Sequence, residues 1–166
     1  MLLAMSPNAT GEPAYRQPGD IHVYIGPEPV ETQELQVRAQ CPEAGAIAQF
    51  CGTVRNHNQG AKVVDLEYDA YIEMATDEIK KIIEEAARQW PIWTVNAVHR
   101  TGPLVVGDIA VCVTVGASHR EEAFSACRYI MDHLKAQAPI WKRETLESGD
   151  KRWLEEHRPK PPEAGS

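Results

Sequence analysis

The sequence of 166 residues predicts an α+β fold in which helices pack on one face of a mainly antiparallel sheet. Three observations favour this class. Strand-like segments occur in consecutive pairs, and two longer segments between them have the apolar repeat of amphipathic helices. Hydrophobic residues make up 43% of the chain and charged residues 25%, which is the balance of a globular protein. A chain of this length can bury a core without disulfides or metals.

The first predicted strand is Ile21–Ile25, where apolar and polar residues alternate, and Thr32–Ala39 predicts a short helix. Residues 45–55 and 62–71 predict two more strands, and residues 56–60 between them have the composition of a turn. We therefore expect these two strands to pair with each other as a hairpin.

Two segments show the periodicity of long helices. The first segment ends near Trp90, because Pro91 stops the helix. Its apolar residues recur at steps of three and four: Ala75, Ile79, Ile82, Ile83, Ala86 and Trp90. The second segment begins at Ser118, which predicts a capping box with Glu121, and ends at Pro139. Its predicted buried stripe consists of Ala123, Phe124, Cys127, Ile130, Met131, Leu134 and Ala138.

Three further strands complete the predicted fold. Residues 93–100 and 109–116 predict a strand pair joined by a connection that contains Gly-Pro and Gly-Asp. Residues 140–145 predict a last strand, after which Trp153 is expected to cover an edge of the core. The predicted order is strand, helix, two strands, helix, two strands, helix, strand.

The two ends of the chain differ in composition from the part between them. Residues 1–19 are rich in Pro, Gly, Ser and Asn without periodicity, and predict a flexible leader. Residues 158–166 carry three prolines that oppose a helix, and predict a flexible tail. Residues 20–157 are therefore expected to form one domain.

Charge and residue spacing disfavour several classes of function. Seventeen Lys and Arg residues against 24 Asp and Glu give a net charge of −7, which opposes non-specific nucleic-acid binding. We expect no membrane span or secretory signal, because no apolar run is long enough. The histidines show no zinc-type pair, so no metal is expected. Cysteines without CxxC spacing predict free thiols in a reducing cytoplasm: Cys41, Cys51, Cys112 and Cys127.

Basic side chains are few, and several lie at ends of predicted elements, where they can converge. Arg55 follows a strand, and His119 with Arg120 opens the second long helix, whose N-terminus favours anions. Lys135 lies on the edge of the apolar stripe near the end of that helix. Partial desolvation would lower its pKa and make its amine nucleophilic, whereas the helix C-terminus stabilises the ammonium. Taken singly, these features are also typical of ordinary solvated helix ends.

The segment after Pro139 contains a second lysine of interest. Alternation along the predicted strand places Lys142 and Glu144 on one face, and Trp141 and Arg143 on the other. We expect Trp141 to face the core. Lys142 would then face outwards with Glu144 as a partner, which is the pattern of an ordinary surface ion pair.

Four motifs occur in fixed order: FCGTVRNHN at 50–58, VHRTG at 98–102 followed by GD at 107–108, ASHR at 117–120, and MDHLKAQAPIWKRE at 131–144. Together they resemble the large, catalytic subunit of molybdopterin synthase, over residues 45–153. The resemblance implies an α/β hammerhead-type fold and a cytoplasmic homodimer. It also implies a heterotetramer with a small ubiquitin-like sulfur-carrier subunit that ends in Gly-Gly, and no metal or redox cofactor.

The same resemblance implies a sulfurtransferase. Sulfur passes from the thiocarboxylate of the carrier to cyclic pyranopterin monophosphate and forms the dithiolene of molybdopterin. Lys135, beside the terminal glycine of the carrier, and Lys142 are the implied catalytic residues. His119 and Arg120 match an anion-binding pair supplied by the neighbouring subunit. The full set of implied substrate-binding residues is Thr53, Val54, Arg55, His119, Arg120, Lys135, Lys142, Arg143 and Glu144.

Two other classes of function stay open at this point. Lys135 could serve a Schiff-base enzyme of the aldolase type, although the sequence offers no clear acid or base carboxylate beside it. The chain could instead be a non-catalytic module that senses an anion. That reading requires Arg55, Lys135 and Lys142 to lie apart in the folded chain.

Overall fold

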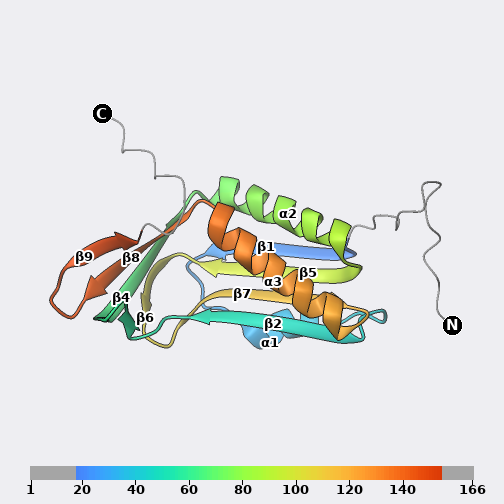
Figure 1. The fold of residues 1–166 in the computed structure, drawn as a ribbon, viewed down its shortest axis with the longest axis horizontal. Coiled ribbons are helices and arrows are strands. Elements are labelled where there is room, and N and C mark those ends of the chain that lie inside the picture. The colour runs from blue at the N-terminus through green and yellow to red at the C-terminus, as the bar shows by residue number, and fades with distance from the viewer. Residues whose placement is uncertain (1–17, 155–166) are drawn as a thin grey trace.

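A computed structural model describes residues 18–154 (Figure 1). Most of the predicted leader and the whole predicted tail lie outside this range. The described part folds into two sheets and three helices, in this order: β1 Asp20–Gly26, α1 Thr32–Arg38, β2 Ala46–Thr53, β3 His57–Asn58, β4 Ala61–Ala70, α2 Ile72–Gln89, β5 Ile92–Arg100, β6 Gly102–Val105, β7 Ile109–Ala117, α3 Arg120–Gln137, β8 Ile140–Leu146 and β9 Lys151–Leu154.

The first sheet has the strand order β1-β5-β7-β2, with β1 parallel to β5 and the other neighbours antiparallel. The long helices α2 and α3 lie side by side over one face of this sheet (Figure 1). The short helix α1 packs against the opposite face through Leu35, which contacts Val98 and Cys112. The predicted α+β class, with a mainly antiparallel sheet and the long helices on one face, is confirmed.

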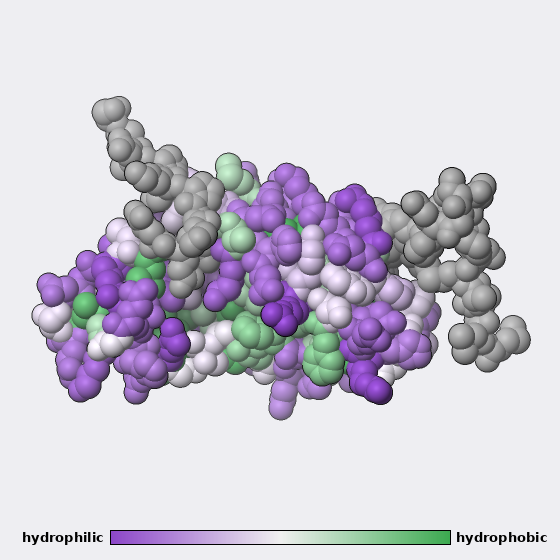
Figure 2. All heavy atoms as spheres, in the orientation of Figure 1, coloured by the Kyte–Doolittle hydropathy of each residue, from purple (hydrophilic) through white to green (hydrophobic). Residues whose placement is uncertain are grey.

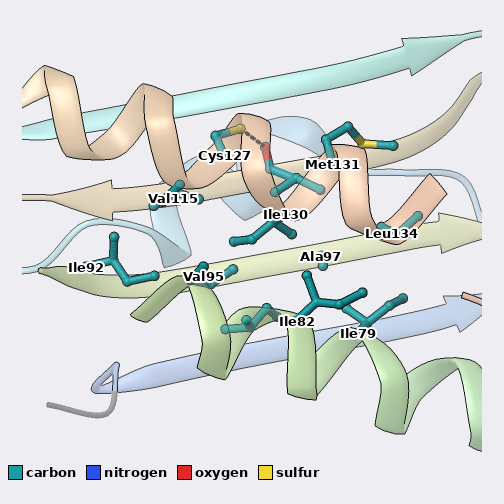
Figure 3. Close-up of a cluster of buried hydrophobic side chains, with 14 of the residues drawn as sticks. Ile79, Ile82, Ile92, Val95, Ala97, Val115, Cys127, Ile130, Met131 and Leu134 are labelled. Carbon is teal, nitrogen blue, oxygen red and sulfur yellow. Dashed lines mark hydrogen bonds between the residues drawn. The ribbon is translucent and has the colours of Figure 1, made fainter. Parts of the chain in front are cut away.

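The main core lies between the two long helices and the first sheet. Figure 3 shows Ile79 and Ile82 of α2, and Ile130 and Leu134 of α3, over the strands that carry Val95 and Val115. The predicted apolar stripes are therefore buried, except that Trp90 is half-buried and Phe124 lies at the surface. Phe124 of α3 is 67% exposed. Because β2 is an edge strand, this flank of α3 has no further strand to cover it.

The predicted capping box at the start of α3 is wrong. The N-cap position is His119, with φ −132° and ψ 160°, and no side chain caps the helix there. The hydroxyl of Ser118 instead accepts a hydrogen bond from Trp93 Nε1 at 2.8 Å. The serine thus joins the helix start to β5 rather than closing the helix on itself.

The predicted pairing of residues 45–55 with 62–71 is also wrong. β2 pairs with β7 in the first sheet, whereas β4 pairs with β3, β6 and β8 in the second. The chain leaves β2 at Val54, whose backbone N–H donates to the carbonyl of Asp108. The tight turn instead joins β3 to β4, where Gln59 and Gly60 have φ values of 48° and 80°.

The second sheet runs β3-β4-β8-β9, with β6 paired to β4, and it lies at one end of the helix-covered sheet (Figure 1). Strands β6 and β9, which have four residues each, were not predicted from the sequence. Trp153 on β9 is 51% exposed, with the Arg143 guanidinium 5.2 Å from its ring centroid. Its predicted role as a core cover is therefore wrong.

Gly116 provides a stability test of the contact between β7 and the chain after α1. A Cβ at this position would lie 2.4 Å from Thr94 Oγ1 and 2.6 Å from the backbone oxygen of Ala39. Thr94 Oγ1 also donates to that oxygen at 2.9 Å. We expect Gly116→Ala to lower the free energy of unfolding by about 1–3 kcal/mol, measured by urea denaturation. Gly19→Ala is the control, because its Cβ would meet one atom at 3.7 Å; equal losses would contradict the explanation.

Candidate functional site

A pocket of about 320 Å³ opens where the two sheets meet. The end of β2 contributes Phe50 and Thr53, β5 contributes His99, and β4 contributes Tyr68. The last two turns of α3 complete the wall together with the start of β8 and the end of β9. Segments far apart in the sequence thus build one site.

Three of the predicted basic residues line this single pocket. Arg55 extends from the end of β2, Lys135 from the last turn of α3, and Lys142 from β8. Thr53 lines the same wall. The structure therefore brings together four predicted site residues. A non-catalytic module was expected only if Arg55, Lys135 and Lys142 lay apart, and they line one pocket instead.

The pocket is positively charged on a chain whose net charge is negative. Three cationic side chains line it, and within residues 18–154 no Asp or Glu does. Clustered cations surrounded by low-dielectric walls attract anions and stabilise developing negative charge. Within residues 18–154, the lining holds no carboxylate that could act as the acid or base of Schiff-base chemistry, so the site suits an anionic substrate better.

Lys135 lies at an exposed position, one turn after the pocket residue Met131 and beside Leu134. The apolar stripe therefore borders the aliphatic part of the Lys135 side chain, as expected from the sequence. Among residues 18–154, the side chain of Lys135 is not buried. A segment of another molecule that enters the pocket can therefore reach it.

Two aromatic residues of the pocket were missed by the sequence analysis. His99 is 4% exposed, and its ring meets that of Tyr68 edge-on with 4.8 Å between centroids. His99 Nδ1 donates to the carbonyl of Arg100 at 2.8 Å. His99 lies inside one of the quoted motifs. The burial of His99 could not be predicted from the local sequence, because it depends on the second sheet.

The expected surface pair of Lys142 and Glu144 is wrong. Glu144 is 2% exposed and lies outside the pocket lining. Its carboxylate accepts hydrogen bonds from Asn58 and Arg152 instead. The expectation that Trp141 faces the core is only partly met, because this residue is half-buried and meets Tyr71 edge-on at 5.1 Å.

Two other predicted residues also lie outside the pocket lining. Val54 is 3% exposed and packs in a small apolar cluster with Val63 and Leu104. Arg143 forms an ion pair with Glu67 on the face of β8 that carries the contact with the Trp153 ring. Neither residue is placed to touch a molecule in this pocket of the same chain.

His119 and Arg120 lie at the opposite end of α3 from the pocket. Lys135 follows Arg120 by 15 residues, which is roughly 22 Å along a helix axis. A single chain therefore does not bring this pair to Arg55.

A second hollow of about 290 Å³ lies between β2 and α3 and has a different character. Phe50 and Phe124 line it, and its two charged residues, Arg128 and Asp132, pair with each other at 3.6 Å. Figure 2 shows apolar surface, in green, among the hydrophilic side chains of this face. Within residues 18–154, three cations and no acidic residue line the first pocket, whereas one cation and one acidic residue line this groove.

Among residues 18–154, no group of His, Cys, Asp or Glu side chains is arranged to hold a metal ion. In the same range, no helix has the length and apolar character needed to cross a membrane.

The fold and the pocket define a class of protein: an α+β chain with a helix-covered sheet, a smaller sheet at one end, and a cationic ligand pocket at their junction. The chain belongs to the MoaE protein family, whose sequence model matches residues 25–137. Five of the nine residues that the sequence analysis assigned to the site lie in the stretch from 53 to 120, and four follow from 135 to 144.

Relatives with established names agree with this family. The molybdopterin synthase catalytic subunit of Escherichia coli K12 is 42% identical over 134 residues, which cover 80% of this chain and 89% of that protein. The subunit of the same name from Thermoplasma volcanium is 41% identical over 132 residues, with coverage of 80% and 96%.

Solved structures share the fold. The molybdopterin synthase structure from Staphylococcus aureus matches with a TM-score of 0.75 and 36% identity, covering 80% of this chain and 96% of that chain. A complex of subunits 1 and 2 of molybdopterin-converting factor from Helicobacter pylori matches with a TM-score of 0.65 and 20% identity, covering 83% and 92%. The second likeness concerns the fold alone.

Proposed function

We propose that this chain is the catalytic subunit of a molybdopterin synthase. It transfers sulfur from the C-terminal thiocarboxylate of a small ubiquitin-like carrier to cyclic pyranopterin monophosphate, in two rounds, and so forms the dithiolene of molybdopterin. The observation that carries this proposal is the meeting of Arg55, Lys135 and Lys142 in one pocket of a MoaE family member. The named relatives support the same reaction.

The pocket chemistry suits both reactants. A phosphate group prefers guanidinium and ammonium donors, which Arg55 and Lys142 supply, with the Thr53 hydroxyl beside them. Transfer at the thiocarboxylate carbon passes through tetrahedral states that carry an oxyanion, and nearby cations stabilise these states. Lys135 can donate or accept a proton there, or trap the acyl carbon.

The carrier partner fits the exposed position of Lys135. A chain that ends in Gly-Gly lacks side chains at its tip, so it can enter a narrow pocket and place its last carbonyl beside an ammonium group. The body of the carrier would remain outside, over the pocket mouth. We place the reaction in the cytoplasm, because Cys41, Cys51, Cys112 and Cys127 are free thiols.

The assembly that we propose is a homodimer with one carrier on each catalytic subunit. His119 and Arg120 lie too far from the pocket of their own chain to bind its substrate. In a dimer they would add two anion donors to the site of the neighbouring subunit. Val54 belongs to an apolar cluster against which the pocket residue Tyr68 packs, and Glu144 is linked to Arg55 through Asn58.

Reconstitution tests the proposal. The purified chain is mixed with thiocarboxylated carrier and cyclic pyranopterin monophosphate, and molybdopterin is measured as its fluorescent oxidation product. We expect product only when the carrier bears the thiocarboxylate. Tight binding of the carrier without consumption of its thiocarboxylate would contradict the assigned reaction.

Mixing two inactive variants tests the shared site. Lys135→Ala and Arg120→Ala are each expected to lose activity, since each removes one contribution to every site. When equal amounts exchange subunits, half of the dimers are mixed and each contains one intact site, so about a quarter of the wild-type activity should return. Denaturation and refolding of each variant alone is the control. No recovery in the mixture would place Arg120 and Lys135 in the same chain's site.

A further inference from the structure

A buried hydrogen-bond network lies behind the pocket and ends on Arg55. Arg55 Nη2 donates to Asn58 Oδ1 at 3.1 Å, and Asn58 Nδ2 donates to Glu144 Oε1 at 2.8 Å. Arg152 donates to Glu144 Oε2 through Nε at 3.0 Å and lies 2.9 Å from it through Nη2. The network thus joins the end of β2 to β3, β8 and β9.

Burial makes this network rigid. Glu144 is 2% exposed and Asn58 is 8% exposed, so each polar atom that lacked a partner would be costly. Both oxygens of Glu144 are satisfied, one by an amide and the other by a guanidinium. Arg152 Nη2 additionally donates to the backbone oxygen of Asn58 at 3.2 Å. The side chain and the backbone of Asn58 are therefore both held in place.

The chemistry of the partners fixes which way the Asn58 amide points. Glu144 is a carboxylate and only accepts, so it must face the NH₂ group. Arg55 is a guanidinium and only donates, so it must face the amide oxygen. The turn at Gln59 and Gly60, with its positive φ values, begins immediately after Asn58 and fixes its backbone.

The distribution of charge in this network gives Asn58 a specific use. The negative charge of Glu144 is matched by Arg152, whereas within residues 18–154 the side-chain partner of Arg55 is a neutral amide. A carboxylate at position 58 would hold Arg55 equally well but would cancel its charge. An amide orients the guanidinium and leaves its positive charge available to a substrate anion.

We propose that Asn58 is a positioning residue for Arg55, supported by the buried Glu144 and the half-buried Arg152. This inference rests on the proposed function, since it assigns Arg55 to the phosphate of the pterin substrate. Asn58 does not line the pocket and acts through Arg55 alone. Glu144 holds Asn58 in place and does not itself contact the substrate.

A double-mutant cycle in the reconstituted synthase tests this inference. Arg55→Ala and Asn58→Ala are each expected to raise KM for cyclic pyranopterin monophosphate, by about tenfold or more for Asn58→Ala. Adding Asn58→Ala to Arg55→Ala should raise KM no further, because Asn58 acts only through the arginine. Asn56→Ala is the matched control: it removes an exposed asparagine that directly precedes β3 and bonds to His57.

The outcomes separate this inference from the proposed function. If Arg55→Ala leaves KM unchanged while the wild type makes molybdopterin, the function stands and the positioning role falls. If the two KM increases multiply in the double variant, Asn58 acts independently of Arg55 and the inference is overturned. If no variant, including the wild type, makes molybdopterin, the proposed function fails and the inference falls with it.

A second pair of variants distinguishes a loss of Arg55 positioning from a loss of stability. Asn58→Asp places two carboxylates where the 2.8 Å hydrogen bond now lies, and it should raise KM and lower Tm. Adding Glu144→Gln places an amide donor at position 144 opposite the carboxylate at position 58. The hydrogen bond can then form in the opposite direction, and Tm should recover. KM should stay high, because the carboxylate introduced at position 58 would still neutralise Arg55. Recovery of both quantities would show that the neutral amide has no special role and would overturn the inference.

Discussion

Replacing Lys135 with alanine is expected to reduce molybdopterin formation at least about a hundredfold while the protein stays folded. The lysine lines the pocket from an exposed position at the last turn of α3, so its removal leaves no cavity in the core. Loss of a positioned acid–base group costs about 10²–10⁴ in rate. The effect should appear in kcat in the reconstituted assay, with carrier binding largely retained.

Lys80→Ala is the matched control for this variant. Lys80 is an exposed lysine on the other long helix, α2, and it does not line the pocket. Both variants should keep the wild-type Tm within error. Full turnover by Lys135→Ala would show that another group carries the transfer, and equal losses in both variants would point to a general effect of removing a helix lysine.

The largest expected effect on stability is that of Ile130→Ala. Ile130 is fully buried where α3 meets the sheet, as Figure 3 shows. Replacing isoleucine with the smaller alanine removes apolar contacts from the core and leaves a cavity, which lowers the free energy of unfolding by about 3 kcal/mol. For a chain of this size the loss corresponds to a fall in Tm of about 6–12 °C, which differential scanning calorimetry measures.

Phe124→Ala on the same helix is the contrasting variant. Phe124 is larger than Ile130, but it is 67% exposed beside the edge strand β2. Its removal should change the free energy of unfolding by about 0.5 kcal/mol or less. A larger loss for Phe124→Ala than for Ile130→Ala would mean that this flank of α3 is covered, and that the described core is not where stability resides.

The sequence allowed the helices and most strands to be predicted because their patterns are local. The stripe from Ala75 to Ala86 and the stripe from Ala123 to Leu134 are buried as the helical period requires. Phe124 was assigned wrongly because periodicity places a residue on a face of a helix. It does not say how far the neighbouring sheet extends beneath that face.

Strand pairing and capping depended on partners distant in sequence. Residues 45–55 and 62–71 are neighbours in the chain, yet hydrogen bonds from Val54 to the loop at Asp108 separate them into two sheets. Ser118 has the residue type of an N-cap, yet Trp93 engages its hydroxyl. Neither the contact of Val54 with the loop at Asp108 nor that of Trp93 with Ser118 could be predicted from local sequence patterns.

The candidate site was predictable only in part. Motif resemblance pointed to Arg55, Lys135 and Lys142, and the structure shows that one pocket contains them all. Asn58 lay inside a quoted motif and was passed over. Its use depends on Glu144, 86 residues further on, and spacing does not encode a contact at that separation.

A structure of this chain with the carrier and cyclic pyranopterin monophosphate bound would test most directly whether one pocket holds both reactants. We expect the terminal glycine of the carrier within about 3 Å of Lys135 Nζ, and the phosphate of the pterin against Arg55. A carrier tail that ends in the apolar groove beside Phe124, or a phosphate bound away from Arg55 and Lys142, would contradict the proposed site.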